Sequence, residues 1–471
     1  MHRYLAVDFG AESGRAILAE LSDGLLQLQE LRRFPNQPIC LPTGLYWNSL
    51  GLFREILESL RAAARQTSGI DSVAIDTWGV DFGLIGQEGA LIDNPRHYRD
   101  VRTAGIEESL FRAVPRSEIF AHTGIQFMEL NSLYQLYAVR QQAPWLLDRA
   151  RALLFMPDLF NYFLSGAMRS ERTIASTSQF YDPAACRFST ELLGKLSIPT
   201  GFLAPLIEPG ERLGCLLPHV AQECGLQVPV YATASHDTAS AVAAVPAAVG
   251  SRWCYISSGT WSLMGVELDR PLLHSAALEA NFTNEAGVGG AIRLLKNIPG
   301  LWLLQECRRA WERQGATHDY AELMEMAAVA EPSATVLDLD VFGAAGQSAE
   351  KIRDYCRATG QQVPKDDGEV CRVILYSLAV RYRRVLHTLE ELTGHPLDVV
   401  HIVGGGARNR LLNQLTADVT ERRVVAGPAE ATAAGNALVQ AMGAGQLSSV
   451  ADIRDVVRRS FGVEEFLPRV G

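Results

Sequence analysis

The sequence predicts an α/β protein made of two similarly built domains, and two observations lead to this prediction. The first is an internal echo, in which a strand, a tight polar turn and a second strand occur near residue 10 and again near residue 259. The second is an alternation of short apolar runs with helical patterns, which is typical of α/β folds. Because similarity at half-chain distance suggests a repeated unit, we expect two related domains, residues 1–249 and 250–471.

The two copies of the echo share one design. In the first, an apolar run at residues 4–7 leads into the polar turn DFGAESGR, and a second apolar run follows at 16–21. In the second, the run at 253–256 leads into SSGTWS and then into the run at 263–266. The glycines let the chain turn and let another group approach the backbone closely. We therefore expect each copy to be a hairpin with an accessible turn.

Three other junctions join an expected strand to a polar turn. They are residues 73–75 before DTWGVD, residues 228–232 before SHDT and a helix from Ala239, and residues 399–403 before GGG and another helix. Ligands of α/β proteins gather at strand ends, so these turns are candidate site segments. Longer helices are expected at residues 52–65, 301–311 and 370–392.

The bulk composition excludes several classes of function. The net charge is −10, whereas a general nucleic-acid binder needs a basic face. The eight cysteines form no CxxC pair and no cluster with zinc spacing, so we expect free thiols. An acid at Asp8 comes too early for a signal peptide, and the apolar stretch 239–249 is too short to span a bilayer. We expect a cytoplasmic protein that binds neither nucleic acid nor membrane.

Phosphoryl transfer from ATP needs donors for the phosphate oxygens, a metal ion, and a group that takes the hydroxyl proton. The echoing turns can supply the donors, since Gly10, Ser13 and Gly14 offer backbone N–H groups. Ser13 and Thr260 add hydroxyls, and Arg15 adds a positive charge. A single glycine-containing hairpin is usually only a hairpin. Two matching copies favour a phosphate-binding interpretation.

Two aspartates each allow two interpretations. Asp8 ends the first strand, where it is either an Asx-type turn residue or a ligand that holds Mg²⁺ through water. Asp237 precedes a run of small helix-forming residues, where it is either a helix N-cap or the general base that accepts the proton of an attacking hydroxyl.

The other polar segments also leave alternatives open. The GGG run before a helix suits close approach by a flat or phosphate-bearing group, or is simply a tight turn. The DTWGVD segment suits a sugar, or is a buried turn with Trp78 in the core. Arg99, Asp100 and Arg102 are typical of a surface ion-pair cluster, and His236 is either an orienting donor or a core histidine.

Taken together, the ordered motifs resemble the FGGY carbohydrate kinases. The motifs, in chain order, are DFGAESGR, DTWGVD, YRDVRT, ASHDTASAV, SSGTW, KNIPGLWLLQE, HIVGGGARN and AEATAAGNA, and they span residues 4–442. The resemblance implies two actin-like, ribonuclease H-like ATPase domains with ATP and sugar in the cleft between them. The strings IDTWGVDFGLI and LKNIPGLWLLQ are similar to the branch that phosphorylates L-rhamnulose, rather than to glycerol or xylulose kinases.

The resemblance also implies roles for individual residues. Asp237 would be the general base, and Asp8 would hold Mg²⁺ through water. The residues implied at the sugar site are Gly79, His236, Asp237, Thr238 and Asn297. Those implied at the ATP site are Ala11, Glu12, Ser13, Gly14, Arg15, Thr260, Gln305 and Gly405. Because Glu12 places an acid in a phosphate turn, we expect it to point away from the phosphates or toward the metal.

The implied activity is ATP-dependent conversion of L-rhamnulose into L-rhamnulose 1-phosphate, a step of L-rhamnose catabolism. The N-terminal domain would bind the sugar and carry the base, and the C-terminal domain would bind the nucleotide. The expected partners are the sugar and ATP with Mg²⁺, and the chain would be a monomer or a homodimer. Two alternatives stay open: a kinase for another ketose, such as L-fuculose or L-xylulose, and an actin-like ATPase with no sugar substrate. Dependence of ATP turnover on added sugar separates the second alternative from a kinase.

Overall fold

The computed structural model describes residues 1–67, 69–316, 318–343 and 346–469. These residues form two compact units, each assembled from separate chain segments. Unit 1 contains Met1–Ala244, Glu267–Leu295 and Ala431–Ser460. Unit 2 contains Val245–Val266, Lys296–Glu430 and the segment from Phe461 onward. Unit 1 thus includes two segments that follow residue 249 in the sequence.

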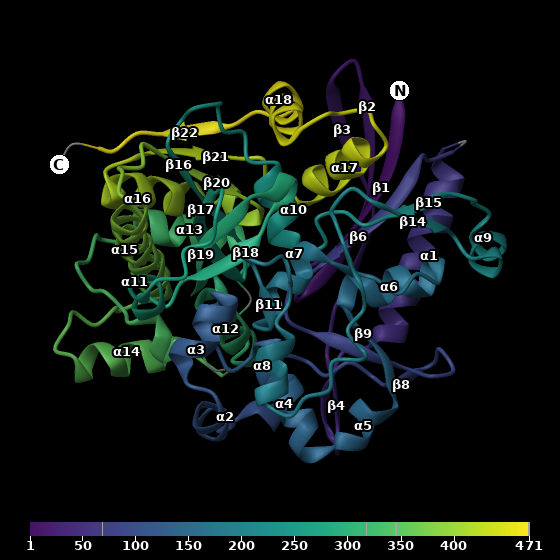
Figure 1. Cartoon of the computed structure of the whole chain (residues 1–471). Helices are drawn as coiled ribbons and strands as arrows, with labels where there is room; N and C mark the ends of the chain where they lie inside the picture. Colours follow the sequence, from purple (N-terminus) through teal and green to yellow (C-terminus); the bar gives the residue numbers. More distant parts are fainter. Residues whose placement is uncertain (68, 317, 344–345, 470–471) are drawn as a thin grey trace. The chain divides into compact units, whose positions relative to one another are not determined.

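Unit 1 is built on a mixed six-stranded sheet with the order β14-β15-β6-β1-β2-β3 (Figure 1). The first three strands of the chain form an antiparallel meander, and β6 and β15 continue the sheet parallel to β1. The bounds are β1 His2–Phe9, β2 Ser13–Ser22, β3 Leu25–Pro35, β6 Ser72–Thr77, β14 Arg212–Cys215 and β15 Pro229–Tyr231.

The two faces of this sheet carry different residues because side chains alternate along a strand. On β1, Leu5, Val7 and Phe9 are fully buried in a core with helices α1 (Ser49–Gln66) and α6 (Met156–Ser165). Ala6 lies on the opposite face and packs with Ala433 of α17 (Ala431–Gly443). By the same alternation, Asp8 lies on the face that α17 covers.

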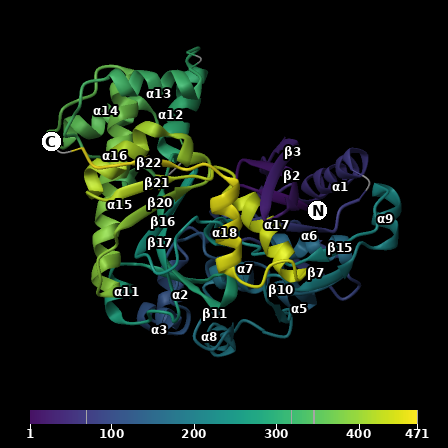
Figure 2. The same ribbon diagram turned by 90° about the horizontal axis from the view of Figure 1, so that it is seen from above.

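Helix α17 is anchored in unit 1 by a close approach to α10 (Asp237–Ala243). A side chain at Gly435 would collide with the backbone carbonyl of Ser240, so the two helices can approach this closely only with glycine there. Figures 1 and 2 show α17, in yellow, beside the purple strands of the N-terminal meander. The last part of the chain therefore covers strands made from the first part.

The remaining elements of unit 1 surround this sheet. A second sheet has the order β8-β7-β9, with β7 Phe82–Gly86, β8 Leu91–Asp93 and β9 Ala150–Phe155. The other helices are α2 Glu107–Ala113, α3 Arg116–Thr123, α4 Ser132–Gln142, α5 Pro144–Arg149, α7 Arg172–Ala175, α8 Thr190–Lys195, α9 Pro218–Cys224, α11 Ser275–Glu279 and α18 Val450–Ser460. The short strands are β4 Ile39–Leu41, β5 Gly44–Tyr46, β10 Ser170–Glu171, β11 Tyr181–Asp182, β12 Arg187–Phe188, β13 Leu206–Ile207 and β18 Thr283–Ala286.

Unit 2 repeats the arrangement of unit 1. Strands β16 and β17 form an antiparallel hairpin, and β20 and then β21 continue the sheet parallel to β16, as β6 and β15 do beside β1. The strands are β16 Trp253–Ser258, β17 Trp261–Leu268, β19 Ile292–Pro299, β20 Val399–Val403, β21 Arg423–Ala426 and β22 Glu464–Phe466, and residues 292–295 of β19 belong to unit 1. The helices are α12 Trp302–Arg313, α13 Tyr320–Val329, α14 Ala349–Ala358, α15 Asp367–Thr393 and α16 Arg410–Thr420. The predicted echo is confirmed as a repeated topology.

The predicted elements occur with boundaries shifted by a few residues. The helices expected at 52–65, 301–311 and 370–392 correspond to α1, α12 and α15. All eight cysteines are free thiols. Within the described part of the chain, no helix is both long enough and apolar enough to cross a membrane.

Candidate active site

Two aspartates meet at the carboxyl ends of the central parallel strands of unit 1. Asp8 of β1 and Asp76 of β6 are direct register partners, and both are buried. Asn436 of α17 donates a hydrogen bond to Asp76 Oδ2 at 2.6 Å, whereas Asp76 Oδ1 has no hydrogen-bond partner among the described residues. Burial and the neighbouring Asp8 carboxylate raise the pKa of Asp76 well above its usual range.

Asp237 opens α10 on the same side of the sheet. The N-cap is His236, so Asp237 is the first helical residue and not the cap that the sequence allowed. Its side chain is 30% exposed. Thr238 donates to Oδ1 from its backbone N–H at 2.5 Å and from its hydroxyl at 3.2 Å. His236 Nε2 lies 3.4 Å from the same oxygen.

These contacts leave one carboxylate oxygen of Asp237 for chemistry. Every hydrogen bond and ion pair of the Asp237 side chain with the described residues involves Oδ1. Burial raises the pKa of Asp237, the nearby His236 ring opposes this change, and the negative charge of Asp8 adds to it. A partly exposed carboxylate with a raised pKa and one oxygen without a partner among the described residues has the properties of a general base.

The turn between β1 and β2 holds the first predicted phosphate-binding residues. The turn closes through a hydrogen bond from Gly10 N–H to the Ser13 carbonyl at 2.9 Å. Ala11 and Ser13 are half-buried, and Glu12 is exposed. Gly14 is buried, because a side chain there would collide with the Phe34 ring. Together these contacts fix the backbone of the turn.

Arg15 and Asp8 form an ion pair beside this turn. The two residues are register partners on the antiparallel strands β2 and β1, so the strand pairing itself brings the charges together. The Arg15 side chain is 18% exposed and the Asp8 side chain 6%. The positive charge of Arg15 is therefore held at the edge where the two aspartates meet.

The DTWGVD segment contributes one accessible glycine and a buried framework. Gly79 is half-buried and lies against Thr177. Trp78 is 6% exposed and belongs to the core, so the interpretation as a buried turn holds for this side chain. Asp81 is buried and accepts hydrogen bonds from Trp78 Nε1 at 3.0 Å and Trp47 Nε1 at 2.6 Å.

The YRDVRT segment is likewise less exposed than an ordinary surface cluster. Asp100 is 5% exposed and accepts hydrogen bonds from the backbone N–H groups of Leu45 and Arg102. Arg102 donates to the amide oxygen of Gln135 at 2.5 Å. The predicted surface location is therefore wrong for Asp100, because its buried carboxylate accepts hydrogen bonds from backbone donors and pairs with Arg96 at 3.6 Å.

The remaining predicted residues, Thr260, Asn297, Gln305 and Gly405, belong to unit 2. Thr260 lies in the β16–β17 turn, and its carbonyl accepts hydrogen bonds from Gly300 and Trp302 N–H groups, which joins the turn to the start of α12. Gln305 lies in α12 and Asn297 in β19, and both are half-buried.

The GGG turn lies beside the β16–β17 turn because β16 and β20 are parallel neighbours. Ser257, the last residue but one of β16, and Val403, the last residue of β20, are register partners. A side chain at Gly406 would collide with Ser258, whereas Gly405 is exposed and has no atom within 4 Å of an added Cβ. Gly405 is thus the member of this run that leaves room for a ligand at the backbone.

A divalent metal ion would find few protein ligands in unit 1. In the ranges that the structure covers, no group of three or more His, Cys, Asp or Glu residues could hold a metal ion by itself. Asp8 and the unpartnered Oδ1 of Asp76 nevertheless offer adjacent carboxylate oxygens. Such a pair suits Mg²⁺, which keeps several waters and usually binds through one or two carboxylates and substrate phosphates.

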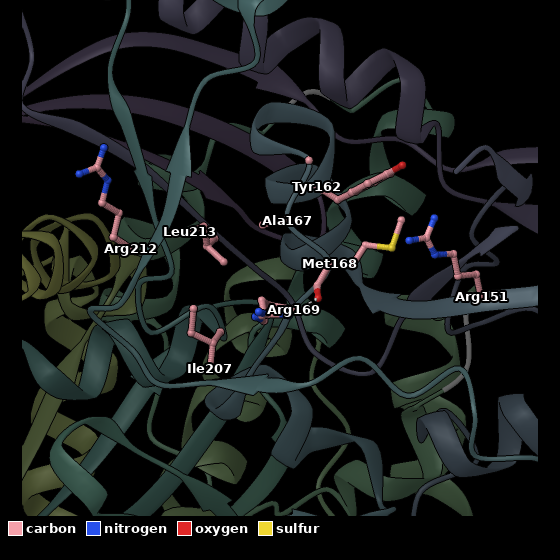
Figure 3. Close-up of a pocket in the computed structure, with 9 residues that line it drawn as sticks. Arg151, Tyr162, Ala167, Met168, Arg169, Ile207, Arg212 and Leu213 are labelled. Carbon is pink, nitrogen blue, oxygen red and sulfur yellow. Dashed lines mark hydrogen bonds between the residues drawn. The ribbon is translucent and has the colours of Figure 1, made fainter. Parts of the chain in front are cut away.

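A separate cavity of about 590 Å³ in unit 1 is lined by none of the predicted site residues. Its lining includes Arg151, Arg169 and Arg212 with the apolar Ile207 and Leu213. In Figure 3 the guanidinium groups of Arg151 and Arg212 lie at opposite ends of the cavity and do not point at a common centre. This arrangement does not form a convergent anion site.

Several residues of the site lie outside the set of site residues predicted from the sequence. Asp76 is the first residue of the DTWGVD motif, and Asn436 belongs to the AEATAAGNA motif. Both motifs could have indicated these residues. Glu171, Glu285 and Arg293, which surround His236 and the segment before Asp237, follow no motif. Their proximity depends on contacts between residues far apart in the sequence, which periodicity does not reveal.

Comparisons with known proteins agree with this arrangement. Residues 3–244 match the model of the N-terminal domain of the FGGY family of carbohydrate kinases, and residues 254–444 match the model of its C-terminal domain. The chain is 45% identical over 469 residues to a rhamnulokinase from Bacteroides thetaiotaomicron, covering 99% of this chain and 96% of that protein. It is 38% identical over 471 residues to a rhamnulokinase from Bacillus subtilis, covering 99% and 95%.

Solved structures agree on the fold. A xylulose kinase from Lactobacillus acidophilus superposes with a TM-score of 0.81 at 13% identity, covering 100% of this chain and 94% of that one. A glycerol kinase from Plasmodium falciparum, solved with ADP, superposes with a TM-score of 0.79 at 15% identity and the same coverage. At these identities the likeness concerns the fold alone.

Proposed function

Because the chain belongs to the FGGY family of carbohydrate kinases, we propose that it is a rhamnulokinase, which transfers the γ-phosphoryl group of ATP to the O1 hydroxyl of L-rhamnulose. The names of the relatives that are 37% to 45% identical over nearly the whole chain support this substrate. The structural observation that carries the proposal is the half-exposed Asp237 carboxylate on the sheet face of Asp8 and Asp76. The product, L-rhamnulose 1-phosphate, would place the enzyme in L-rhamnose catabolism.

In the proposed mechanism Asp237 is the general base. Its Oδ2 accepts the proton of the sugar hydroxyl. The hydroxyl oxygen attacks the γ-phosphorus at the same time, and ADP departs. The raised pKa of Asp237 makes this carboxylate a stronger base. His236, Thr238 and Gly79 of unit 1 and Asn297 of unit 2 are proposed to bind the sugar hydroxyls.

The nucleotide is proposed to bind through the two echoing turns. In unit 1, residues 11–15 offer backbone N–H groups, the Ser13 hydroxyl and the Arg15 charge. In unit 2, Thr260, Gln305 and the open backbone at Gly405 are proposed ATP contacts. Exposed Glu12 is proposed to point away from the phosphates, which its negative charge would repel.

Asp8 is proposed to hold Mg²⁺ through water, with Asp76 beside it. The bound ion would offset the negative charge of the transferring phosphoryl group. Arg15 would hold the Asp8 carboxylate in place through their ion pair. A chelator should therefore abolish turnover, and added Mg²⁺ should restore it.

A coupled assay of ADP release tests the proposed reaction. The panel contains L-rhamnulose, L-fuculose, L-xylulose, D-xylulose and glycerol, each with ATP and Mg²⁺. We expect L-rhamnulose to give the highest kcat/KM, because relatives that are 45% and 38% identical over nearly the whole chain are rhamnulokinases. A higher kcat/KM for glycerol or D-xylulose would contradict the substrate. ADP release that is independent of every sugar would indicate an ATPase without a sugar substrate.

A further inference from the structure

Three side chains of unit 1 surround the imidazole of His236. Arg293 Nη2 lies 3.2 Å from His236 Nδ1 and 3.1 Å from Glu285 Oε2. Glu285 Oε2 itself lies 3.2 Å from Nδ1. On the other edge of the ring, Nε2 lies 3.4 Å from Asp237 Oδ1. The ring therefore connects a buried ion pair to the carboxylate proposed as the base.

Strand pairing puts the ion pair in place. Glu285 of β18 and Arg293 of β19 are direct partners in an antiparallel pair. Arg293 is completely buried, and its Nε donates to the Ala286 carbonyl at 3.1 Å. A buried guanidinium stays protonated and needs a carboxylate nearby. Burial opposes ionisation of Glu285, but His236 and Arg293 outweigh it and hold the pKa of Glu285 below its usual range.

The hydrogen bond from Arg293 decides which nitrogen of His236 carries the proton. A guanidinium has only N–H donors, so Nδ1 must accept with its lone pair. In a neutral imidazole the proton is then on Nε2. Glu285 Oε2 is the competing partner at 3.2 Å from Nδ1, but within the described residues only the Arg293 contact with Nδ1 has hydrogen-bond geometry.

We propose that Arg293 is a positioning residue: by donating to Nδ1 it keeps the imidazole proton of His236 on Nε2, the nitrogen that faces Asp237. This inference rests on the proposed function. Nε2 lies 3.4 Å from Oδ1 of Asp237, the oxygen that also accepts the two hydrogen bonds from Thr238. Oδ2 is left to take the proton of the sugar hydroxyl. The opposite tautomer would set the lone pair of Nε2 against the carboxylate.

Hydrogen bonds hold the backbone at Ser235 and His236 in place, so the backbone does not move His236 to different side-chain partners. The N–H of His236 donates to the Thr173 hydroxyl at 3.2 Å, and the N–H of Ser235 donates to Glu171 Oε2 at 3.1 Å. The Ser235 carbonyl accepts from Thr77 N–H at 2.9 Å. Because the main chain is held by three partners, the side-chain partner at Nδ1 sets the tautomer.

Nitrogen-15 NMR of histidine-labelled enzyme reads the tautomer directly, without substrate. The chain has ten histidines, so the His236 signals are assigned by their loss in His236→Gln. In the wild type we expect an unprotonated Nδ1 and a protonated Nε2. In Arg293→Met, which keeps the length but removes the donors, we expect Nδ1 to become protonated and to face Glu285. A protonated Nδ1 in the wild type, or an unchanged Nδ1 in Arg293→Met, would overturn the proposal.

Kinetics test whether the tautomer matters for the reaction. We expect Arg293→Met to lower kcat about 10- to 100-fold, because the base is no longer oriented, and to leave KM for ATP nearly unchanged. The control is Arg454→Met, which removes a guanidinium paired with Glu267 at 2.5 Å in the same unit and should keep both kcat and the His236 signals. An unchanged kcat in Arg293→Met would overturn the positioning role.

Two further results distinguish a folding defect from failure of the positioning role, and failure of the positioning role from failure of the proposed function. If Arg293→Met does not fold, Arg293→Lys replaces it in these measurements, because lysine retains a donor on a flexible chain. The wild-type spectrum alone can still contradict the proposed tautomer. If the wild type phosphorylates no ketose, the proposed function fails and the positioning role fails with it. The spectrum would then still report which nitrogen Arg293 engages.

Discussion

Asp8 and Asp76 lie directly opposite each other on the parallel strands β1 and β6, and their side chains leave the same face of the sheet. The pairing concentrates two carboxylates at one strand edge, and Asn436 satisfies only one oxygen of Asp76. The Asp8 carboxylate raises the pKa of Asp76, and two adjacent carboxylates also attract a cation. This edge is therefore where the reaction proposed above would place its metal ion.

The first prediction separates the structural and catalytic roles of Asp237. Asp237→Asn keeps the shape and can still accept the hydrogen bond from Thr238 N–H, so the melting temperature and ATP binding should stay near those of the wild type. The amide cannot accept the hydroxyl proton, so kcat should fall by about 10²–10⁴-fold. Calorimetry, ATP titration and the ADP-release assay measure these quantities. A folded variant with near-normal kcat would remove Asp237 from the mechanism.

The second prediction concerns Glu171, a buried carboxylate that accepts hydrogen bonds from Thr173, Ile174 and Ser235. Burial raises its pKa to about 7, although these bonds oppose the change. Between pH 4.5 and 7 the folded chain therefore holds a proton that the unfolded chain has released. The free energy of unfolding should fall as pH rises through this window, by about 3 kcal/mol for this group.

Urea denaturation at pH 5, 6 and 7 measures that slope. Glu171→Gln should be less stable at pH 5 and should show a flatter dependence on pH, because the titrating group is gone. The matched control is Glu208→Gln, whose side chain is 53% exposed and pairs with Arg172. Equal slopes in Glu171→Gln and the wild type would contradict the assigned titration.

The third prediction compares two neighbouring glycines of unit 2. Gly405→Ala has room for its methyl group, so folding should be unaffected. If ATP approaches the backbone there, binding should weaken by about 1–2 kcal/mol, or roughly tenfold in Kd. Gly406→Ala should instead destabilise the fold by about 1–3 kcal/mol, because its methyl group collides with Ser258. Unchanged ATP affinity in Gly405→Ala would remove Gly405 from the nucleotide site.

The fourth prediction concerns the contact between α10 and α17. Gly435→Ala would push a methyl group into the carbonyl of Ser240, so urea denaturation should show a loss of about 1–3 kcal/mol. Gly201→Ala serves as the control, because an added Cβ there has no atom within 4 Å. If Gly435→Ala were as stable as this control, the two helices would have to separate without cost.

The repeated hairpins and their parallel neighbours could be predicted because the evidence for them is local. An apolar run that ends at Asp8 or before Gly404 shows where a strand stops, and the structure has a strand end at both places. The register that pairs Asp8 with Asp76 could not be predicted, because it depends on which strands pair.

The set of chain segments that make up unit 1 could not be predicted from the sequence either. The sequence suggested a single boundary near residue 249, and no local feature of residues 267–295 indicates that they pack with unit 1. The surroundings of His236 depend on this packing, since Glu285 and Arg293 both come from that segment. The motifs indicated Asp237 and the polar turns as candidate site residues but did not indicate the side chains that surround His236.

The interleaved path of unit 1 has a consequence for how the protein is made. Strand β1 leaves the ribosome more than 400 residues before Gln440 of α17, which donates to the Leu5 carbonyl at 3.2 Å. At ordinary translation rates of about 5–20 residues per second, that face of the sheet stays uncovered for roughly 20 to 90 seconds. A nascent chain stalled before α17 would leave the sheet face that carries Ala6 and Ile17 uncovered, so we expect chaperone binding and aggregation to concentrate in that interval.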